Sequence, residues 1–568
     1  MLILGISDNH DAGAAVVADG RLLAAVGQER LDRQKNSGAF PWQAIETALG
    51  LAGVGAGEVD RIVVGSGYTP ATALRALPTF HHARRDEGTF SYLLNLYILY
   101  QVALRRSGLQ VAEIAASEVL LSRRLAARGF TRARLELMDH HEAHAQAAYR
   151  SQPRTECLVV TLDAMGDGAT ATVWEGRDGQ LRRRWEQSGL ASVNSFYSRI
   201  TQLLGFRPNR HEGKITGLAA FAVPPPELLD HMRRRVCFQG PGFSRTDYWR
   251  PHAPDDRFWG FIARYPREEV AAAAQRVLEE AVTAFVRHHV TAAGLPHVAV
   301  VGGTFANVAV NRRVAELPEV ESLFVYPNMG DGGLPVGAAL GAAQVPPARL
   351  PHVYLGPSIE DAEVERLLSG SGLCFSRPAD LTAMVAARIA ERRVVARCAG
   401  PMEWGPRALG NRSILYRADD PAVNDWLNKR LKRTEFMPFA PMTLAEDAPG
   451  LYRQLGKSAD AARFMTICYA VDPSMKRDCA GVIHVDGTAR PQVLHREDNP
   501  EMHAILAAYK ALTGTGTIVN TSFNMHEEPI VCSAQDALRA WRAADLDALV
   551  LGSFLVERQG SQPERSMA

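Results

Sequence analysis

The chain has 568 residues, which is enough for roughly two to four folded domains and excludes a small scaffold held together by disulfides. Hydrophobic residues make up 46% and charged residues 22%, as in ordinary globular proteins, so extensive disorder and a fibrous repeat are excluded. Lys and Arg number 63 against 62 Asp and Glu, and the net charge of +1 gives no overall field that would attract nucleic acid or an acidic membrane surface. We therefore expect neither nucleic acid nor a membrane as a partner.

The cysteines and the apolar segments indicate the compartment. Seven scattered cysteines include no C-x-x-C pair, so we expect neither a disulfide framework nor a thiolate zinc site. The N-terminus has no basic leader and reaches Asp8 early, which argues against a signal peptide. The longest strongly apolar run, residues 92–104, contains Asn95 and Gln101 and is shorter than the about 18–20 residues that span a bilayer. We interpret this run as a buried helix and expect a cytoplasmic protein.

The first part of the chain contains a repeated pattern. Its opening predicts strands over 2–6, 12–18 and 21–28, a polar turn over 7–11, and a helix over 42–51. The same order of strand, acidic turn, small-residue strand and hairpin returns over 157–185, with the second turn at 163–168. Two copies predict a duplicated domain with a cleft between its halves. This arrangement is typical of the actin-like class, in which the first turn of each half faces a nucleotide or substrate.

Two further transitions from strand to helix are rich in glycine. A strand over 297–301 enters Gly302-Gly303, and a strand over 324–326 leads through residues 327–333 into a helix that begins near Val336. Glycine lets backbone amides come close to an anion or to another helix.

The second part of the chain is set apart by prolines. Three prolines within residues 346–351 cannot continue the preceding helix. We predict a first domain over 1–345, a Pro-rich linker over 346–352 and a second α/β domain over 353–568. The pattern of the second domain predicts strands over 394–397, 440–444 and 517–519 and helices over 421–431 and 534–544. Residues 233–259 show no clear period, and they fit either a substrate-contacting insertion or a packed surface loop.

Three histidines cluster in the segment Asp139-His140-His141-Glu142-Ala143-His144, which precedes Ala-rich helical sequence. On a helix, His140 and His144 lie one turn apart on the same face and can both reach one cation. The order of residues differs from the H-E-x-x-H of zinc proteases, so a protease is disfavoured. The alternative is that the histidines form a helix cap or a polar face.

Two aspartates supply candidate oxygen ligands. Asp163 and Asp331 each follow an apolar strand, and with His140 and His144 they would complete a site of mixed nitrogen and oxygen ligands. Such a set favours iron, manganese or zinc over magnesium. The alternative is that both aspartates only cap their Gly-rich turns. His10 would face the same cleft if the duplication holds, and its ordinary pKa near ~6.5 makes it a candidate base.

The second domain carries cations among glycines, prolines and small polar residues. They lie in four segments, Gly405–Ser413, Lys432-Arg433, Asp486–Arg490 and Asn520–Asn524. Guanidinium groups bind phosphate through paired hydrogen bonds, which Ser and Asn side chains can complete. The sequence has no G-x-x-x-x-G-K-[ST] motif, so a P-loop is not the phosphate-binding device. Together the four segments predict a phosphate site, against the alternative that each arginine is a solvated surface residue.

These motifs resemble those of a known family, the NodU/TobZ-type ATP-dependent O-carbamoyltransferases, along nearly the whole chain. The N-terminal part of the resemblance rests on His10–Ala15, Gln28–Lys35, His140–His144, Gly213–Ala219 and Gly302-Gly303. The C-terminal part rests on Glu403–Ser413, Pro438–Pro441, His484–Arg490 and Asn520–Asn524. Each pattern is modest alone, whereas their joint order and spacing are specific.

The resemblance implies an α/β protein with an N-terminal actin-like domain (ASKHA, a duplicated RNase H-like fold) and a C-terminal YrdC-like α/β domain. The second domain would convert carbamoyl phosphate and ATP, used with Mg²⁺, into carbamoyl-adenylate. The first would transfer the carbamoyl group to a hydroxyl of a small acceptor such as a sugar or a secondary metabolite. The identity of the acceptor and the formation of a homodimer are left open.

The resemblance also implies roles for residues at matching positions. His140, His144, Asp163 and Asp331 would bind Fe²⁺ or another divalent metal. His10 would be catalytic near the acceptor hydroxyl, and Lys35 would contact the carbamoyl-adenylate. The residues that would hold ATP and carbamoyl phosphate are Arg407, Lys432, Arg433, Arg490, Asn520 and Ser522.

The chain departs from the family pattern at Met437, where many members have an arginine before the Pro-Phe-Ala-Pro motif. Methionine cannot make a charge-assisted contact to phosphate. Either Lys432 or Arg433 compensates, or the details of nucleotide binding differ.

Two other functions are alternatives. An actin-like small-molecule kinase would release ADP rather than AMP and would leave the arginine-rich second domain unexplained. A nucleotide-gated binding protein would use the same cleft without catalysis.

Overall fold

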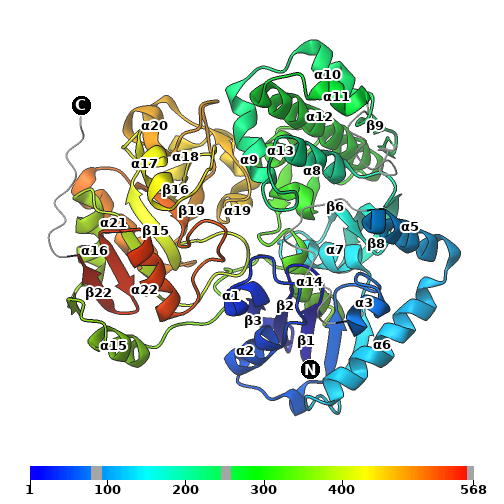
Figure 1. Cartoon of the computed structure of the whole chain (residues 1–568), viewed down its shortest axis with the longest axis horizontal. Helices are drawn as coiled ribbons and strands as arrows, with labels where there is room; N and C mark the ends of the chain where they lie inside the picture. The colour runs from blue at the N-terminus through cyan, green and yellow to red at the C-terminus, as the bar shows by residue number, and fades with distance from the viewer. Residues whose placement is uncertain (78–91, 245–256, 559–568) are drawn as a thin grey trace. The chain divides into compact units, whose positions relative to one another are not determined.

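The computed structural model describes residues 1–77, 92–244 and 257–558. The chain divides into two compact units, and Figure 1 shows it coloured along the sequence. The first unit comprises residues 1–28 and 36–350, and the second comprises residues 29–35 and 351–568. The division after Leu350 falls within the Pro-rich stretch 346–352. The segment 29–35, which the sequence placed in the first domain, makes its contacts with the second unit.

The first unit contains two five-stranded sheets of the same topology. The first sheet, in the order β3-β2-β1-β4-β5, consists of β1 (Leu2–Ser7), β2 (Gly13–Ala18), β3 (Arg21–Gly27), β4 (Arg61–Val64) and β5 (Arg134–Leu137). The second, in the order β8-β7-β6-β11-β12, consists of β6 (Cys157–Gly166), β7 (Ala169–Arg177), β8 (Gln180–Ser188), β11 (His297–Val301) and β12 (Ser322–Val325). In each sheet, three antiparallel strands form a meander and two further strands continue in parallel. The repeated topology confirms the predicted duplication and the actin-like class.

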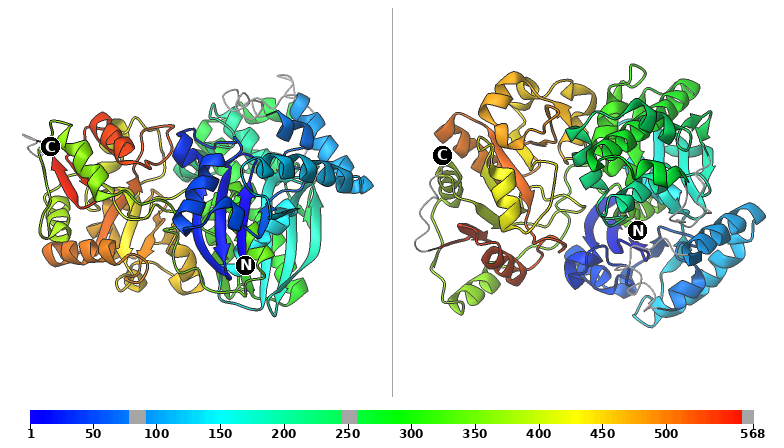
Figure 2. Two further views of the ribbon diagram at one scale, coloured as in Figure 1. Left: turned by 90° about the horizontal axis from the view of Figure 1, so that it is seen from below. Right: turned by 45° about the horizontal axis from the view of Figure 1, so that its top comes forward.

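Helices cover these sheets, and Figure 2 shows α2 beside the N-terminal strands, drawn in blue. The helices and short strands of this part of the chain are α1 (Gln28–Asp32), α2 (Trp42–Ala52), α3 (Thr72–Ala76), α5 (Tyr92–Ser107), α6 (Gln110–Ala126), α7 (His140–Arg150), α8 (Val193–Leu203), α9 (Glu212–Leu218), α10 (Pro226–Arg233), β9 (Phe238–Gln239), β10 (Gly242–Phe243), α11 (Arg257–Ile262), α12 (Arg267–Ala293), α13 (Val308–Ala315) and α14 (Leu334–Ala342).

Helices α7 and α14 join the two halves of the first unit. Helix α14 packs on β1, and α7 packs on β6. The two helices come so close that a Cβ added at Gly337 would lie 1.9 Å from the carbonyl oxygen of Ala143. Glycine is required here because any side chain would separate the helices. This packing fixes the N-terminal end of α7 near the chain that leads into α14.

Three expectations need correction or fall outside the described residues. The predicted buried helix exists as α5, but it is not buried throughout: Ile98 and Val102 face inward, while Leu96 is 61% exposed. A helix that packs against the protein on one side buries only the residues on that side, even where the whole run is apolar. The predicted turn 163–168 is shorter, because β6 continues through an irregular stretch to Gly166. In the segment 233–259, residues 245–256 lie outside the described part, and the rest forms β9, β10 and part of α11.

The second unit is a mixed α/β structure around an eight-stranded sheet, in the order β13-β22-β21-β14-β15-β20-β16-β19. The sheet consists of β13 (Phe375–Ser376), β14 (Val395–Cys398), β15 (Arg412–Arg417), β16 (Ala440–Leu444), β19 (Gln492–Leu494), β20 (Thr517–Ser522), β21 (Ala548–Leu551) and β22 (Phe554–Glu557), and β17 (Tyr469–Ala470) pairs separately with β18 (Thr488–Ala489). The helices are α15 (Asp361–Ser369), α16 (Leu381–Ala390), α17 (Val423–Arg430), α18 (Ala448–Leu451), α19 (Ala459–Ala462), α20 (Pro473–Asp478), α21 (Pro500–Thr513) and α22 (Ala534–Ala543). The strands and helices predicted for this region are present.

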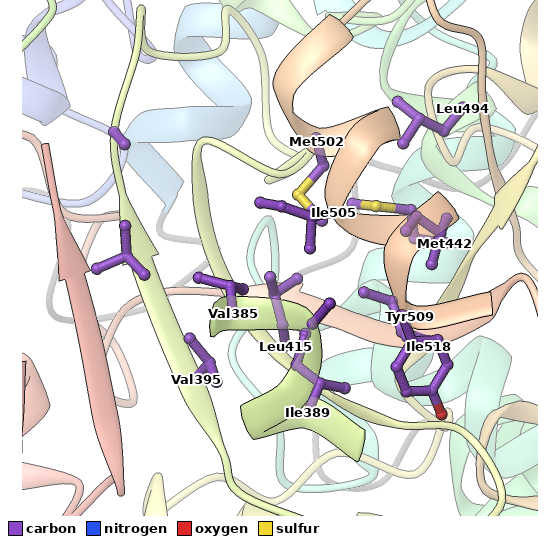
Figure 3. Close-up of a cluster of buried hydrophobic side chains, with 14 of the residues drawn as sticks. Val385, Ile389, Val395, Leu415, Met442, Leu494, Met502, Ile505, Tyr509 and Ile518 are labelled. Carbon is purple, nitrogen blue, oxygen red and sulfur yellow. The ribbon is translucent and has the colours of Figure 1, made fainter. Parts of the chain in front are cut away.

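The core of the second unit lies between the sheet and helices α16 and α21. Figure 3 shows Val385 and Ile389 from α16 in one cluster with Ile505 from α21, Leu415 of β15 and Ile518 of β20. These side chains are at most 1% exposed. Their burial fixes the central strands whose ends carry the predicted phosphate-binding residues.

Among the residues that the structure describes, no helix is both long and apolar enough to cross a membrane.

Candidate functional site

Helix α7 presents the predicted histidine pair. The carboxylate of Asp139 caps the helix by accepting a hydrogen bond of 3.0 Å from the backbone N–H of Glu142. His140 and His144 are fully buried and lie one turn apart on this helix. The prediction that both point to one place therefore agrees with the structure.

Asp163 of β6 and Asp331, just before α14, meet these histidines. Nε2 of His140 lies 3.2 Å from Oδ2 of Asp163 and 3.6 Å from Oδ1 of Asp331. Nε2 of His144 lies 3.4 Å and 3.5 Å from the same two oxygens. One donor atom from each of the four residues lies within 4.8 Å of the others. The structure thus brings together all four residues predicted as metal ligands.

The chemistry of this cluster fits a divalent transition metal. Two imidazole nitrogens and two carboxylates form a donor set suited to iron, manganese or zinc. Both ring nitrogens of His144 are buried and make no hydrogen bond. A buried polar atom without a partner is costly, and coordination of a cation by Nε2 would satisfy one of them.

Neighbouring groups that the sequence analysis missed orient the cluster. The hydroxyl of Ser66 lies 2.9 Å from Nδ1 of His140, which leaves Nε2 of that ring facing the carboxylates. The amide of Asn9 donates a hydrogen bond of 3.0 Å to Oδ2 of Asp331, and Oδ2 of Asp167 accepts the backbone N–H of His140. Gly166 leaves room for the ring, because a Cβ there would lie 2.1 Å from Cδ2 of His140. The positions of Asn9, Ser66 and Asp167 at strand ends were the available sequence signal.

His10 lies beside this cluster. Its Nδ1 is 3.1 Å from Oδ2 of Asp331, and its side chain is 52% exposed. Asp331 therefore turns one oxygen toward the histidine pair and the other toward His10. The structure places the predicted catalytic residue next to the predicted ligands, as the duplication argument requires.

The carboxylates control protonation of these histidines. Burial lowers the pKa of His140, but Asp331 and Asp163 outweigh it and raise this pKa to about 9. Desolvation likewise opposes the charged form of His10, and the charges of Asp331 and Asp11 raise its pKa to about 10. The acidic pair thus favours positive charge nearby, either as protons on the histidines or as a cation.

The third histidine has a structural role. Nδ1 of His141 lies 2.6 Å from the hydroxyl of Thr161, and Nε2 lies 3.1 Å from the carbonyl oxygen of Ala169. Burial, together with the neighbouring His140, lowers the pKa of His141 to about 3. This ring stays neutral and ties α7 to the second sheet.

In the second unit, the loop between β14 and β15 carries Arg407. Oε1 of the buried Glu403 accepts backbone N–H bonds from Leu409 (2.7 Å), Asn411 (2.8 Å) and Arg412 (3.2 Å). The role of Glu403 was missed by the sequence analysis, although it stands in the quoted motif. The loop is therefore held by side-chain bonds at its base, and Arg407 sits near its middle.

Of the other predicted phosphate-binding residues, Asn520 is bonded to this loop, and Arg433 is bonded to the end of the strand that carries Asn520. Asn520, in β20, donates to the carbonyl oxygen of Ala408 at 3.2 Å. Arg433 donates to the hydroxyl of Thr521 (3.1 Å) and to the carbonyl oxygen of Ser522 (2.7 Å), so it shapes the end of β20. Lys432, in contrast, is exposed.

Buried polar atoms in this region lack protein partners. They are Nε of Arg407, Nε of Arg490 and Oδ1 of Asn520. Burial and the nearby Arg490 lower the pKa of Arg407 to about 9, although Glu435 offsets part of this effect. Two desolvated guanidinium groups close enough to repel one another form a site suited to an anion with several oxygens.

Lys35 is half-buried and belongs by its contacts to the second unit. Met437 is also half-buried in this unit. Arg433, one of the two residues expected to compensate for Met437, is engaged with the end of β20.

Comparison with known proteins agrees with this division of the chain. The family description "Carbamoyltransferase N-terminus" matches residues 2–340, and "Carbamoyltransferase C-terminus" matches residues 386–558. The nodulation protein NolNO of Sinorhizobium fredii is 32% identical over 98% of this chain and 80% of its own length. The 3'-hydroxymethylcephem-O-carbamoyltransferase of Amycolatopsis lactamdurans is 25% identical over 98% of this chain and 99% of its own length. The chain belongs to the carbamoyltransferase family.

Proposed function

We propose that the protein uses ATP to activate carbamoyl phosphate as carbamoyl-adenylate and transfers the carbamoyl group to a hydroxyl of a small molecule. The observation that carries the proposal is the pair of half-buried arginines, Arg407 and Arg490, each with a buried Nε–H that has no partner, in a chain that also contains a cluster of histidines and aspartates. The arginine pair suits phosphates, and the cluster of histidines and aspartates suits a cation. Activation by a nucleotide would use the phosphate site, and transfer of the activated carbamoyl group would use the cation site.

The second unit would carry out the activation. Arg407 and Arg490 would bind phosphate oxygens of ATP, used with Mg²⁺, and of carbamoyl phosphate, and Asn520, Lys432, Arg433 and Ser522 would complete the site. Water would first cleave carbamoyl phosphate to carbamate and inorganic phosphate. An oxygen of carbamate would then attack the α-phosphorus of ATP, the bond to the β-phosphate would break, and pyrophosphate would leave. Fixed guanidinium groups stabilise the negative charge that develops on these phosphates.

The first unit would carry out the transfer. The acceptor oxygen attacks the carbamoyl carbon, the bond to the AMP oxygen breaks, and AMP leaves. Nδ1 of His10 lies 3.1 Å from Oδ2 of Asp331, and its Nε2 lies 3.7 Å from Oδ2 of Asp11. These carboxylates favour the protonated ring, and a cation bound at Asp331 would offset their charge, so that Nε2 could take the hydroxyl proton. A divalent metal, Fe²⁺ or a similar ion, held by His140, His144, Asp163 and Asp331 would supply Lewis acidity when bound.

A direct assay tests the proposal. The protein is incubated with labelled ATP, carbamoyl phosphate, Mg²⁺ and Fe²⁺, and with a panel of sugars and hydroxylated metabolites. We expect AMP and pyrophosphate that depend on carbamoyl phosphate, and a carbamoyl mass increment on an acceptor. Formation of ADP and a phosphorylated acceptor would instead identify a kinase, and nucleotide binding without turnover would identify a binding protein.

All seven cysteines are unpaired in the structure. This supports our proposal that the enzyme works in the reducing cytoplasm.

A further inference from the structure

Residues 29–35, which we call the strap, leave the first unit and return to it. At both ends the chain is bonded to the turn next to His10. The backbone N–H of Gln28 donates to the carbonyl oxygen of Ala12 at 2.8 Å, and the N–H of Ala12 donates to the carbonyl oxygen of Ser37 at 2.7 Å. The side-chain amide of Asn36 donates to Oδ1 of Asp11 at 2.7 Å. Both ends of the strap are therefore fixed to the two residues that follow His10.

The middle of the strap is bonded to the second unit. The buried Arg30 donates to the carbonyl oxygen of Gly405 at 2.9 Å, two residues before Arg407. Arg33 donates to the carbonyl oxygens of Pro529 (2.8 Å) and Ile530 (2.7 Å). By these contacts the strap belongs to the second unit, whereas the residues that flank it in the sequence belong to the first.

Arg33 is the firmest of these attachments. Besides the two carbonyl bonds, its Nε lies 3.3 Å from Oδ1 of Asp536, in the first turn of α22. Its backbone has a left-handed φ of 60°, which is unfavourable for a residue with a Cβ. The planar guanidinium donates to two carbonyl oxygens while its charge lies beside a carboxylate, which a lysine ammonium cannot do with the same geometry.

We propose that Arg33, supported by Arg30, is a positioning residue that holds Lys35 on the second unit, so that carbamoyl-adenylate is retained for the acceptor instead of being lost to water. This inference rests on the proposed function. With an acceptor, the hydroxyl oxygen bonds to the carbamoyl carbon, AMP leaves and the proton passes to His10. If water reaches the adenylate, the products are AMP and carbamate, and carbamate decomposes to ammonia and carbon dioxide.

The test uses the full chain without an acceptor, with ATP, Mg²⁺ and carbamoyl phosphate as the only substrates. In the unaltered protein we expect a burst of pyrophosphate close to one equivalent, followed by slow release of AMP. Arg33→Ala should keep the burst and accelerate the later AMP release about tenfold or more, because a misplaced contact exposes the intermediate to water. Arg33→Lys, which keeps the charge but not the paired bonds, should lie between the two.

The matched control is Arg539→Ala, on the same helix as Asp536. Arg539 is exposed and pairs with Glu528 at 2.6 Å, so the change removes an ion pair near Arg33 but removes none of the bonds that Arg33 makes. Equal AMP release from Arg33→Ala and Arg539→Ala would overturn the inference. Loss of the pyrophosphate burst in soluble Arg33→Ala and Arg33→Lys would overturn it too, since the strap would then be needed for activation itself. Absence of any burst in the unaltered protein would reject the proposed function instead.

Discussion

The two units concentrate charge of opposite sign at their candidate sites. In the first unit, Asp163 and Asp331 concentrate negative charge beside His140, and that charge raises the pKa of the ring. In the second unit, Arg407 and Arg490 concentrate positive charge, and burial with mutual repulsion lowers the pKa of Arg407. Each site therefore favours a ligand of the opposite sign, a cation in the first unit and an anion in the second.

The same contrast appears in how the sites are built. The histidines sit on one capped helix, and hydrogen bonds from Ser66 and Asn9 orient the donor atoms. Arg407 instead sits on a loop whose backbone amides converge on the carboxylate of Glu403. If this comparison is right, damage to one site should leave the chemistry of the other intact.

The largest effect is expected from removing both histidines of the first site. His140→Ala combined with His144→Ala leaves only two carboxylates, so bound metal should be lost and carbamoyl transfer should fall at least about a hundredfold. Formation of pyrophosphate from ATP and carbamoyl phosphate should continue. Metal analysis and product mass spectrometry measure the two losses, and the exposed His288→Ala is the control. Full metal content in the double variant would contradict the first half of the comparison.

The corresponding experiment for the second unit changes Arg407. Arg407→Ala removes a half-buried guanidinium whose buried Nε–H has no partner, and pyrophosphate formation should fall about a hundredfold because a charge-assisted phosphate contact is lost. Metal content should stay the same. The exposed Arg366→Ala serves as the control. Unchanged turnover of ATP would show that the nucleotide binds elsewhere.

The sequence predicted the parts of these sites that depend on local pattern. His140 and His144 follow from helical spacing, and Asp163 follows from an apolar strand that ends in an acidic residue. The resemblance to a family supplied the role of Lys35, which no local pattern could assign, whereas Arg490 already stood in a segment whose pattern predicted phosphate binding.

Other features depend on tertiary contacts that sequence periodicity does not encode. The bonds from Ser66 to His140 and from Asn9 to Asp331 join residues 74 and 322 positions apart. The grouping of residues 29–35 with the second unit likewise depends on Arg30 and Arg33 reaching residues about 375 and 500 positions away. The exposed flank of α5 was mispredicted because an apolar run does not reveal which of its faces is covered.

The protonation of His140 should make metal binding in the first unit depend on pH. A metal bound at Nε2 must displace a proton from His140, whose pKa is raised to about 9 by the two aspartates despite burial. Apparent affinity for Mn²⁺ should therefore fall about tenfold for each pH unit below 9 and level off above it. Calorimetry at pH 7 and 8 in buffers of different ionisation enthalpy measures both the affinity and the released proton. An affinity independent of pH across this range would show that His140 is not a ligand.

The smallest effect is expected from a residue that touches no substrate. Ser66→Ala removes the hydroxyl 2.9 Å from Nδ1 of His140, so the ring is free to turn and Nε2 is no longer held toward the aspartates. Loss of such an orienting hydrogen bond costs about 10- to 100-fold in metal affinity, and equilibrium dialysis with Mn²⁺ measures it. Ser107→Ala, an exposed serine in the same unit, should leave the affinity unchanged. Ser66 belongs to the first unit, so pyrophosphate formation by the second unit should be the same in both variants. Slower pyrophosphate formation in Ser66→Ala would mean that the two sites are not independent.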